Sequence, residues 1–175
     1  MAKPPMSQAG ESNGINIRSP SFFLARTVGT CGHCRRPTSL FALAVPPGHR
    51  TLELDHDGEA EDLASDAWLL ADHCAFLFHI EFLPTAVQVR VKQLTQSDRF
   101  GFSDAATGAL WGNHCDQCDS FLNDEELFCE PEGAFLPTSE SSAGLIHLLR
   151  IDEEFEATAA GYAFEPPFFD AMATD

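Results

Sequence analysis

Cys31-Gly-His-Cys34 and, much later in the chain, Cys115-Asp-Gln-Cys118 are the two stretches that decide this fold. Two residues between paired cysteines allow one tight turn to present both thiolates to a single ion. Two such turns supply the four sulfur ligands of a structural zinc site. The sequence therefore predicts one structural Zn²⁺ held by Cys31, Cys34, Cys115 and Cys118, and a fold that brings the two turns together.

The size and composition of the chain favour one domain. The 175 residues, 44% of them hydrophobic, are enough for one core, so residues 21–175 are expected to form a single zinc-stabilised domain. Residues 1–20 are rich in Pro, Gly, Ser, Asn and Gln, which predicts a flexible N-terminal leader. The chain lacks an apolar segment typical of a signal peptide or a membrane span, so we expect a cytoplasmic protein and reduced cysteines.

The flanks of the first cysteine pair predict strands. Residues 22–30 are rich in strand-forming side chains and run directly into Cys31, and residues 38–45 form a second such run that ends at two prolines. This pattern indicates a strand, a zinc knuckle and a returning strand. Residues 51–56 alternate in polarity and are expected to form a further strand.

The segment between the knuckles is more ambiguous. Acidic residues and apolar spacing predict a short helix over residues 59–70. Residues 74–83 and 87–94 are expected to form a central hairpin, because the first run would place Phe76, Phe78, Ile80 and Phe82 on one face and the second alternates. A long helix over residues 61–83 is the alternative interpretation.

The second knuckle follows a short apolar run, residues 109–114, and is followed by a turn at Asn123-Asp124 and an apolar return over residues 127–129. Residues 145–151 are expected to form a strand or a short helix. The aromatic segment 162–170 is expected to pack extended along the domain, with a free partner-binding tail as the alternative. Together these elements predict an α+β, mainly antiparallel fold built around a zinc-ribbon-like unit, with a sheet and a short helix in the insertion.

Other cysteines and histidines offer alternative ligands. His33 and His114 adjoin the knuckles and could replace a cysteine, although such residues more often donate hydrogen bonds to ligands. Cys129 could add a third local sulfur to the second pair. Cys74, with Asp72, His73 and His79, could form a second metal site, but a lone cysteine in an apolar run is more often a core residue.

A redox function is a further alternative, because Cys31-Gly-His-Cys34 is also the dithiol pattern of thiol-disulfide oxidoreductases. In those enzymes a helix follows the motif and lowers the pKa of a thiol. Here Pro37 and strand-forming residues follow it. Four sulfur ligands also leave no coordination position for a reactive water, which argues against zinc hydrolysis.

The charge distribution suggests what kind of partner the protein has. The formal charge is −17, and residues 100–175 hold sixteen acidic residues against the single basic residue Arg150. Such a surface repels phosphate backbones and attracts basic proteins, although it also simply confers solubility. We therefore expect a non-enzymatic, acidic protein-interaction module with a basic protein partner. Nucleic-acid binding through a basic edge near Arg35 and Arg36 is the alternative, which the summed charge opposes.

The second knuckle carries a resemblance to a known group. The run Trp111-Gly-Asn-His-Cys-Asp-Gln-Cys118, followed by Asn123-Asp124 and Gly133-Ala-Phe135, resembles a group of uncharacterised bacterial proteins with two Cys-x-x-Cys pairs. Arg26-Thr27 and the first cysteine pair match the early part of that pattern. The resemblance implies a zinc-ribbon-like domain and no activity. Asp119 departs from the glycine that often follows the second cysteine of zinc knuckles.

Overall fold

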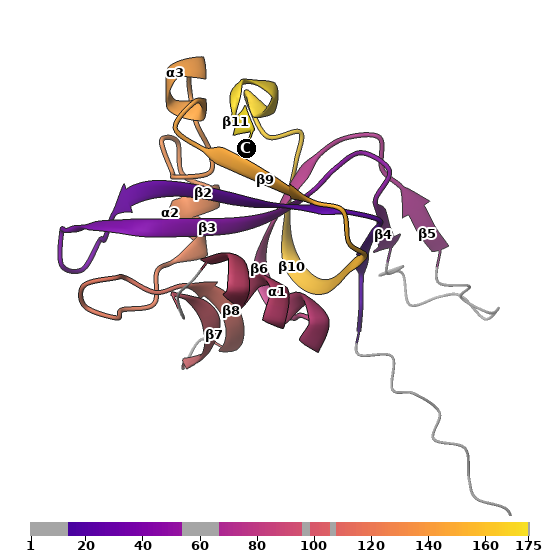
Figure 1. Cartoon of the computed structure of the whole chain (residues 1–175), viewed down its shortest axis with the longest axis horizontal. Coiled ribbons are helices and arrows are strands. Elements are labelled where there is room, and N and C mark those ends of the chain that lie inside the picture. Colours follow the sequence, from indigo (N-terminus) through magenta and orange to yellow (C-terminus); the bar gives the residue numbers. More distant parts are fainter. Residues whose placement is uncertain (1–13, 54–66, 96–98, 106–107, 175) are drawn as a thin grey trace, which may run out of the picture.

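The structure, a computed structural model, describes residues 14–53, 67–95, 99–105 and 108–174 (Figure 1). Over these residues the chain forms a mainly antiparallel sheet of eleven strands with a few short helices. The strands are β1 (Ile17–Ser19), β2 (Phe22–Thr30), β3 (Pro37–Val45), β4 (Arg50–Glu53), β5 (Ala67–Leu70), β6 (Ala75–Phe82), β7 (Phe100–Ala105), β8 (Gly108–Asn113), β9 (His147–Ile151), β10 (Phe155–Phe164) and β11 (Ala173–Thr174). The helices are α1 (Thr85–Thr95), α2 (Asp124–Phe128), α3 (Glu140–Ala143) and the 3₁₀ turn η1 (Phe169–Ala171).

The order of the strands is β11-β9-β2-β3-β6-β10-β1-β4-β5, and β8 joins at β6 with β7 beside it. Every described pairing is antiparallel except that of β11 with β9. Long strands β2 and β3 pair along almost their whole length, from Phe23 opposite Ala44 to Thr30 opposite Pro37. They form a hairpin that extends beyond the rest of the sheet and carries the first cysteine pair at its tip (Figure 1).

The sheet is covered on both faces, so it has two apolar clusters. One cluster packs α1 against the sheet through Val87 and Val91. The other packs the segment after the second knuckle against the opposite face, with Phe128 stacked on Phe135 at 5.0 Å and Phe76 among them. Burial on both faces explains why β3 is apolar at every position from Leu40 to Val45 instead of alternating. No helix within the described ranges is both long and apolar enough to cross a membrane.

Residues 87–94 form most of helix α1, so the predicted central hairpin with residues 74–83 is wrong. Val87 and Val91 are buried and stand four residues apart, whereas Val89 is 49% exposed. Alternating valines therefore satisfy a helical spacing as well as a strand spacing. The Pro84 carbonyl accepts a hydrogen bond from Gln88 N–H and begins the helix, and the partner strands of β6 are β3, β8 and β10.

Residues 74–83 include a strand, as expected, so the alternative long helix over 61–83 is wrong where the chain is described. The prediction that Phe76, Phe78 and Ile80 share one face is also wrong: Phe76 and Phe78 pack in one cluster and Ile80 in the other. His79, between them, has a positive φ of 48°, which interrupts the alternation of the strand.

Two further expectations need correction. The helix predicted over 59–70 is wrong for Ala67–Leu70, which is strand β5 and pairs with β4, while residues 54–66 lie outside the described residues. The flexible leader predicted over 1–20 is wrong for Ile17–Ser19, because this strand pairs with both β10 and β4 and Ile17 is buried. Residues 1–13 are not described.

The strand, knuckle and strand predicted over 22–45 is confirmed. Residues 147–151 form a strand, and the C-terminal aromatic segment packs on the domain: Phe169 lies against Phe23 and Phe76, and Met172 is buried. The expected apolar return after the second knuckle is instead helix α2, which begins at the N-cap Asn123. Asn, Asp and Glu at the start of a segment favour a helix N-terminus, so these residues signal a cap here.

Candidate metal centre

The first knuckle closes the hairpin of β2 and β3. Cys31 N–H donates to the carbonyl of Arg36 and Arg35 N–H donates to the carbonyl of Cys31, both at 2.9 Å. Cys34 N–H points at Cys31 Sγ at 3.5 Å. The backbone of the turn thus directs both sulfur atoms to the same side and supports one of them with an N–H donor.

The second knuckle repeats this pattern after β8. Cys115 N–H donates to Ser120 O at 2.9 Å, Asp119 N–H donates to Cys115 O at 3.0 Å, and Gln117 N–H lies 3.4 Å from Cys115 Sγ. The residue after each second cysteine, Arg35 or Asp119, has a φ of 60°. Asp119 therefore takes the left-handed conformation that glycine provides in other knuckles, and both turns close in the same way.

Asn113 at the end of β8 and Asp116 of the second knuckle hydrogen-bond β3 and hold the two turns together. Asn113 is 1% exposed, accepts from Phe41 N–H through Oδ1 and donates to Phe41 O through Nδ2, both at 2.8 Å. Asp116 Oδ2 accepts from Ser39 N–H at 2.7 Å, and Asp116 N–H donates to Thr38 Oγ1 at 2.9 Å. β3 pairs with β6 only from Leu43 onward, so these side chains occupy the free edge of its first half.

The four sulfur atoms converge to the spacing of a tetrahedral metal site. All four lie within 4.8 Å of one another. The Cys31 and Cys118 sulfurs are 3.8 Å apart, and those of Cys34 and Cys115 are 3.6 Å apart. Metal–sulfur bonds of about 2.3 Å at tetrahedral angles place ligand sulfurs about 3.8 Å apart. The group fits one metal ion, and the two close pairs each join one knuckle to the other.

The thiols of this group differ in how readily they ionise. Burial opposes ionisation of Cys115, but the backbone N–H groups of Gln117 and Cys118 outweigh it and lower its pKa to about 6. A hydrogen bond from the Arg36 backbone favours the thiolate of Cys34, yet desolvation and the neighbouring thiols raise its pKa to about 11. A metal-free cluster therefore keeps protons that a bound metal would displace.

Arg99 binds the outer side of the second knuckle. Its Nη1 donates to Asp119 Oδ1 at 2.6 Å and to the carbonyl of Cys115 at 3.3 Å, and its Nε lies 3.8 Å from Asp116 Oδ1. The single guanidinium of Arg99 thus contacts both acidic side chains of the second knuckle and one of its backbone carbonyls. Sequence reasoning missed Asn113, Asp116 and Arg99. The available signal was an amide just before the cysteine pair and a carboxylate within it, because such residues commonly hydrogen-bond nearby backbone.

The other proposed ligands lie outside this group. Across the described residues, Cys31, Cys34, Cys115 and Cys118 form the group whose ligand atoms converge, and His33, His114, Cys74 and Cys129 do not belong to it. His33 is exposed, and the His114 ring packs on Phe121 at 5.2 Å.

The residues proposed for a second metal site point to different partners. His73 Nε2 lies 2.9 Å from the hydroxyl of Tyr162, which also lies 2.5 Å from buried His49. His79 instead faces Glu125 at 3.7 Å. The structure thus separates His79 from His73 and Cys74, and uses His73 in a hydrogen-bonded chain that the sequence did not reveal.

Comparison with known proteins found no matching family model, curated protein or solved structure. Over the described residues, two features characterise the chain. One is the eleven-stranded, mainly antiparallel sheet, and the other is the four-cysteine group formed by two Cys-x-x-Cys pairs.

Proposed function

We propose that Cys31, Cys34, Cys115 and Cys118 bind one structural Zn²⁺ and that the two knuckles form a zinc-ribbon-like unit of the kind found in the bacterial double Cys-x-x-Cys proteins that this chain resembles. The observation that supports this proposal is the convergence of four sulfurs at 3.6–4.8 Å. Zinc is the metal that most commonly occupies tetrahedral four-cysteine sites in proteins. The ion would close the long loop between the knuckles and stabilise the fold.

A non-enzymatic role agrees with this coordination. Four protein ligands fill a tetrahedral zinc, so neither a water nor a substrate has a position on the ion. A thiol oxidoreductase based on Cys31 and Cys34 has less support. The close sulfur contacts run from Cys31 to Cys118 and from Cys34 to Cys115, an arrangement of four ligands around one centre.

The acidic surface beside the centre is the proposed binding surface for a basic protein partner. Glu125, Glu126, Glu130 and Glu132 are exposed on α2 and the turn after it. Within the described chain, none of them forms an ion pair with a lysine or arginine, whereas Glu153 and Glu156 do so with Arg90 and Arg18. Glu125 faces His79 at 3.7 Å. Carboxylates that form no ion pair with a lysine or arginine keep more of their attraction for an incoming cation.

This surface adjoins the first knuckle, because Glu126 Oε2 lies within 3.5 Å of the position a Cβ would take on Gly32. Arg35 and Arg36 are exposed on the same knuckle. A carboxylate beside this small basic edge weakens its attraction for a phosphate backbone. The same neighbourhood favours a protein partner with basic residues over a nucleic acid.

The experiment titrates zinc-loaded protein with a lysine-rich peptide at low and moderate salt. We expect binding that weakens with salt, and a further loss in the Glu126→Gln, Glu130→Gln, Glu132→Gln triple variant. The matched control removes three carboxylates that already pair with arginines: Asp152→Asn, Glu153→Gln and Glu156→Gln. Binding that ignores salt, or equal losses in the two triple variants, would count against this surface. Duplex DNA and RNA should not bind at low salt.

A further inference from the structure

A hydrogen-bonded chain joins three segments of the fold at the hydroxyl of Tyr162 on β10. His49, in the turn between β3 and β4, places its Nε2 2.5 Å from this hydroxyl and its Nδ1 2.7 Å from the carbonyl of Pro46. His73, in the loop between β5 and β6, places its Nε2 2.9 Å from the same hydroxyl and its Nδ1 3.3 Å from the exposed carboxylate of Asp72. Two imidazoles from distant parts of the sequence thus share one phenol.

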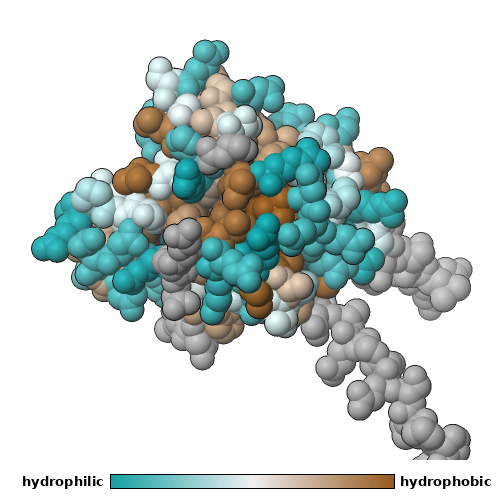
Figure 2. All heavy atoms as spheres, viewed as in Figure 1, coloured by the Kyte–Doolittle hydropathy of each residue, from teal (hydrophilic) through white to brown (hydrophobic). Residues whose placement is uncertain are grey.

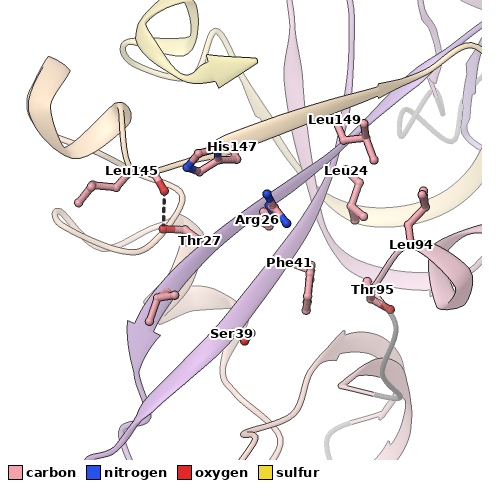
Figure 3. Close-up of a pocket in the computed structure, with 11 residues that line it drawn as sticks. Leu24, Arg26, Thr27, Ser39, Phe41, Leu94, Thr95, Leu145, His147 and Leu149 are labelled. Carbon is pink, nitrogen blue, oxygen red and sulfur yellow. Dashed lines mark hydrogen bonds between the residues drawn. The ribbon is translucent and has the colours of Figure 1, made fainter. Parts of the chain in front are cut away.

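His49 differs from the other histidines of the described chain because it is fully buried, at 0% exposed. His147, by comparison, is half-buried and lines a hollow of about 600 Å³ formed by β9, β2, β3 and the end of α1 (Figure 3). Figure 2 shows an apolar area between β9 and α1, bordered by hydrophilic residues. Burial lowers the pKa of His49 below its ordinary value of 6.5, and the nearby His73 adds to this effect, against the opposing contact with the Pro46 carbonyl.

The partners of the chain fix the direction of each hydrogen bond. A carbonyl only accepts, so His49 carries a hydrogen on Nδ1, and its Nε2, when the ring is neutral, accepts from Tyr162. The phenol keeps its single hydrogen, because burial and the nearby Cys74 raise the pKa of Tyr162 to about 12. His73 must therefore donate to the phenol oxygen through Nε2. The hydrogen bonds then run from His73 through Tyr162 and His49 to Pro46.

This chain accommodates one added proton on its two imidazoles but not two. With one imidazole charged, the charged ring donates to the phenol oxygen, and the phenol hydrogen turns to the ring that is still neutral. With both rings charged, both Nε2 atoms donate to the same oxygen. The phenol hydrogen then has an acceptor on neither ring, and two positive charges lie on either side of one oxygen. The second proton therefore breaks the chain.

We propose that His49, Tyr162 and His73 form an acid-sensitive latch, which stays closed while the two imidazoles share at most one added proton and opens when both are charged. The latch joins the turn at residues 46–49 and the loop at residues 71–74 to β10. Beside it, Gly48 N–H donates to the carbonyl of Ala71 at 2.8 Å, and Ala71 N–H donates to the carbonyl of His49 at 2.9 Å. These two amides report whether the turn and the loop are held together.

Other titratable groups lie around the latch. Asp72 is exposed to solvent beside His73, and Cys74 lies near Tyr162. Burial, together with Asp170 of η1, raises the pKa of Cys74, so this thiol stays neutral in mild acid. Carboxyl groups ordinarily titrate near pH 4. Among these groups, imidazoles are the ones that ordinarily titrate between pH 5.5 and 7.5.

The first test follows amide hydrogen exchange of the zinc-loaded wild-type protein at pH 7.5 and 5.5, corrected for the intrinsic exchange rate. The open state binds more protons than the closed state, so acid favours opening. The opening equilibrium at Gly48 and Ala71 should increase about 10-fold, the factor expected when opening frees one imidazole with an ordinary pKa of 6.5. Phe41 N–H, which binds Asn113 beside the knuckles, should change less than about 2-fold. No increase at Gly48 and Ala71, or an equal increase at all three amides, would overturn the latch.

The second test, His73→Gln, separates the latch from a histidine that is simply buried. The amide of glutamine offers either an N–H or a carbonyl to Tyr162, so the phenol hydrogen keeps an acceptor when His49 is charged. The increase on acidification should fall to about 3-fold or less. The control His79→Asn removes an imidazole outside the chain and places asparagine at a φ of 48°, which this residue tolerates, so it should keep the full increase. A full increase in His73→Gln would refute the role of the second imidazole.

Imidazole ¹⁵N NMR of the wild-type protein decides the question if His73→Gln does not fold. In the closed protein, His49 should carry its hydrogen on Nδ1 at pH 7.5 and should still be neutral at pH 5.5. A hydrogen on Nε2 of neutral His49, or a charged His49 in the closed protein together with a charged His73, would overturn the proposal.

Discussion

Replacing Asn113 by alanine tests how the second knuckle is held against β3. Asn113 is 1% exposed, and its amide satisfies both the N–H and the carbonyl of Phe41 at 2.8 Å. In Asn113→Ala these two buried backbone groups lose their partners. Each orphaned group costs about 1–3 kcal/mol, so the free energy of unfolding should fall by about 2–6 kcal/mol. Zinc affinity should fall as well, because the knuckles are no longer aligned.

The assay is urea unfolding at a fixed free zinc concentration, with zinc affinity measured by competition against a chelator. Asn123→Ala is the matched control, because it removes an asparagine whose side chain makes one exposed N-cap hydrogen bond to Glu125 N–H. That change should lower stability by about 1 kcal/mol and leave zinc affinity unchanged. If Asn113→Ala costs no more than this control, the side-chain bridge does not hold the two knuckles together.

Three further predictions concern two cysteines, the buried carboxylate of Asp124, and the positive backbone φ of Arg35 and Asp119. Cys34→Ser should release the metal and lower the unfolding temperature markedly, since structural zinc contributes roughly 10 kcal/mol or more in small domains, whereas Cys129→Ser should retain the metal. Inductively coupled plasma analysis of both variants checks this. Burial raises the pKa of Asp124 above its ordinary value of 3.8, so the folded state disfavours the ionised form of this carboxyl. The free energy of unfolding therefore decreases as the pH rises from 3.8 through the raised pKa of the folded state. Asp124→Asn should therefore unfold at a higher temperature than wild type at pH 7, with a gain that disappears below about pH 4; a gain independent of pH would refute this reasoning. Arg35 is exposed with a φ of 60°, and Arg35→Gly should raise the free energy of unfolding by about 0.5–1 kcal/mol, while Asp119→Gly gains less because it loses the ion pair with Arg99.

The cysteine group was predictable because its spacing depends on local turn chemistry. Two residues between cysteines restrict the backbone so strongly that each knuckle can be inferred without tertiary information. The hairpin around the first pair was predictable for the same reason, since its strands begin and end at the turn. The residues that join the knuckles were not, because the contact of Asn113 with Phe41 spans 72 residues.

The secondary-structure predictions that were wrong have a different cause. A run with valines at every second position also places Val87 and Val91 four residues apart, and only packing against the sheet selects the helix. Ile17–Ser19 forms a strand because β10 and β4 offer hydrogen-bonding edges on both sides, which the composition of this polar segment does not show.

The most direct measurement is the zinc content of the purified chain together with its zinc X-ray absorption spectrum. We expect one zinc per chain with four sulfur neighbours at about 2.3 Å. A protein that carries no zinc under zinc-replete conditions, a coordination sphere with nitrogen or oxygen ligands, or a disulfide between Cys31 and Cys34 would contradict the four-cysteine metal centre.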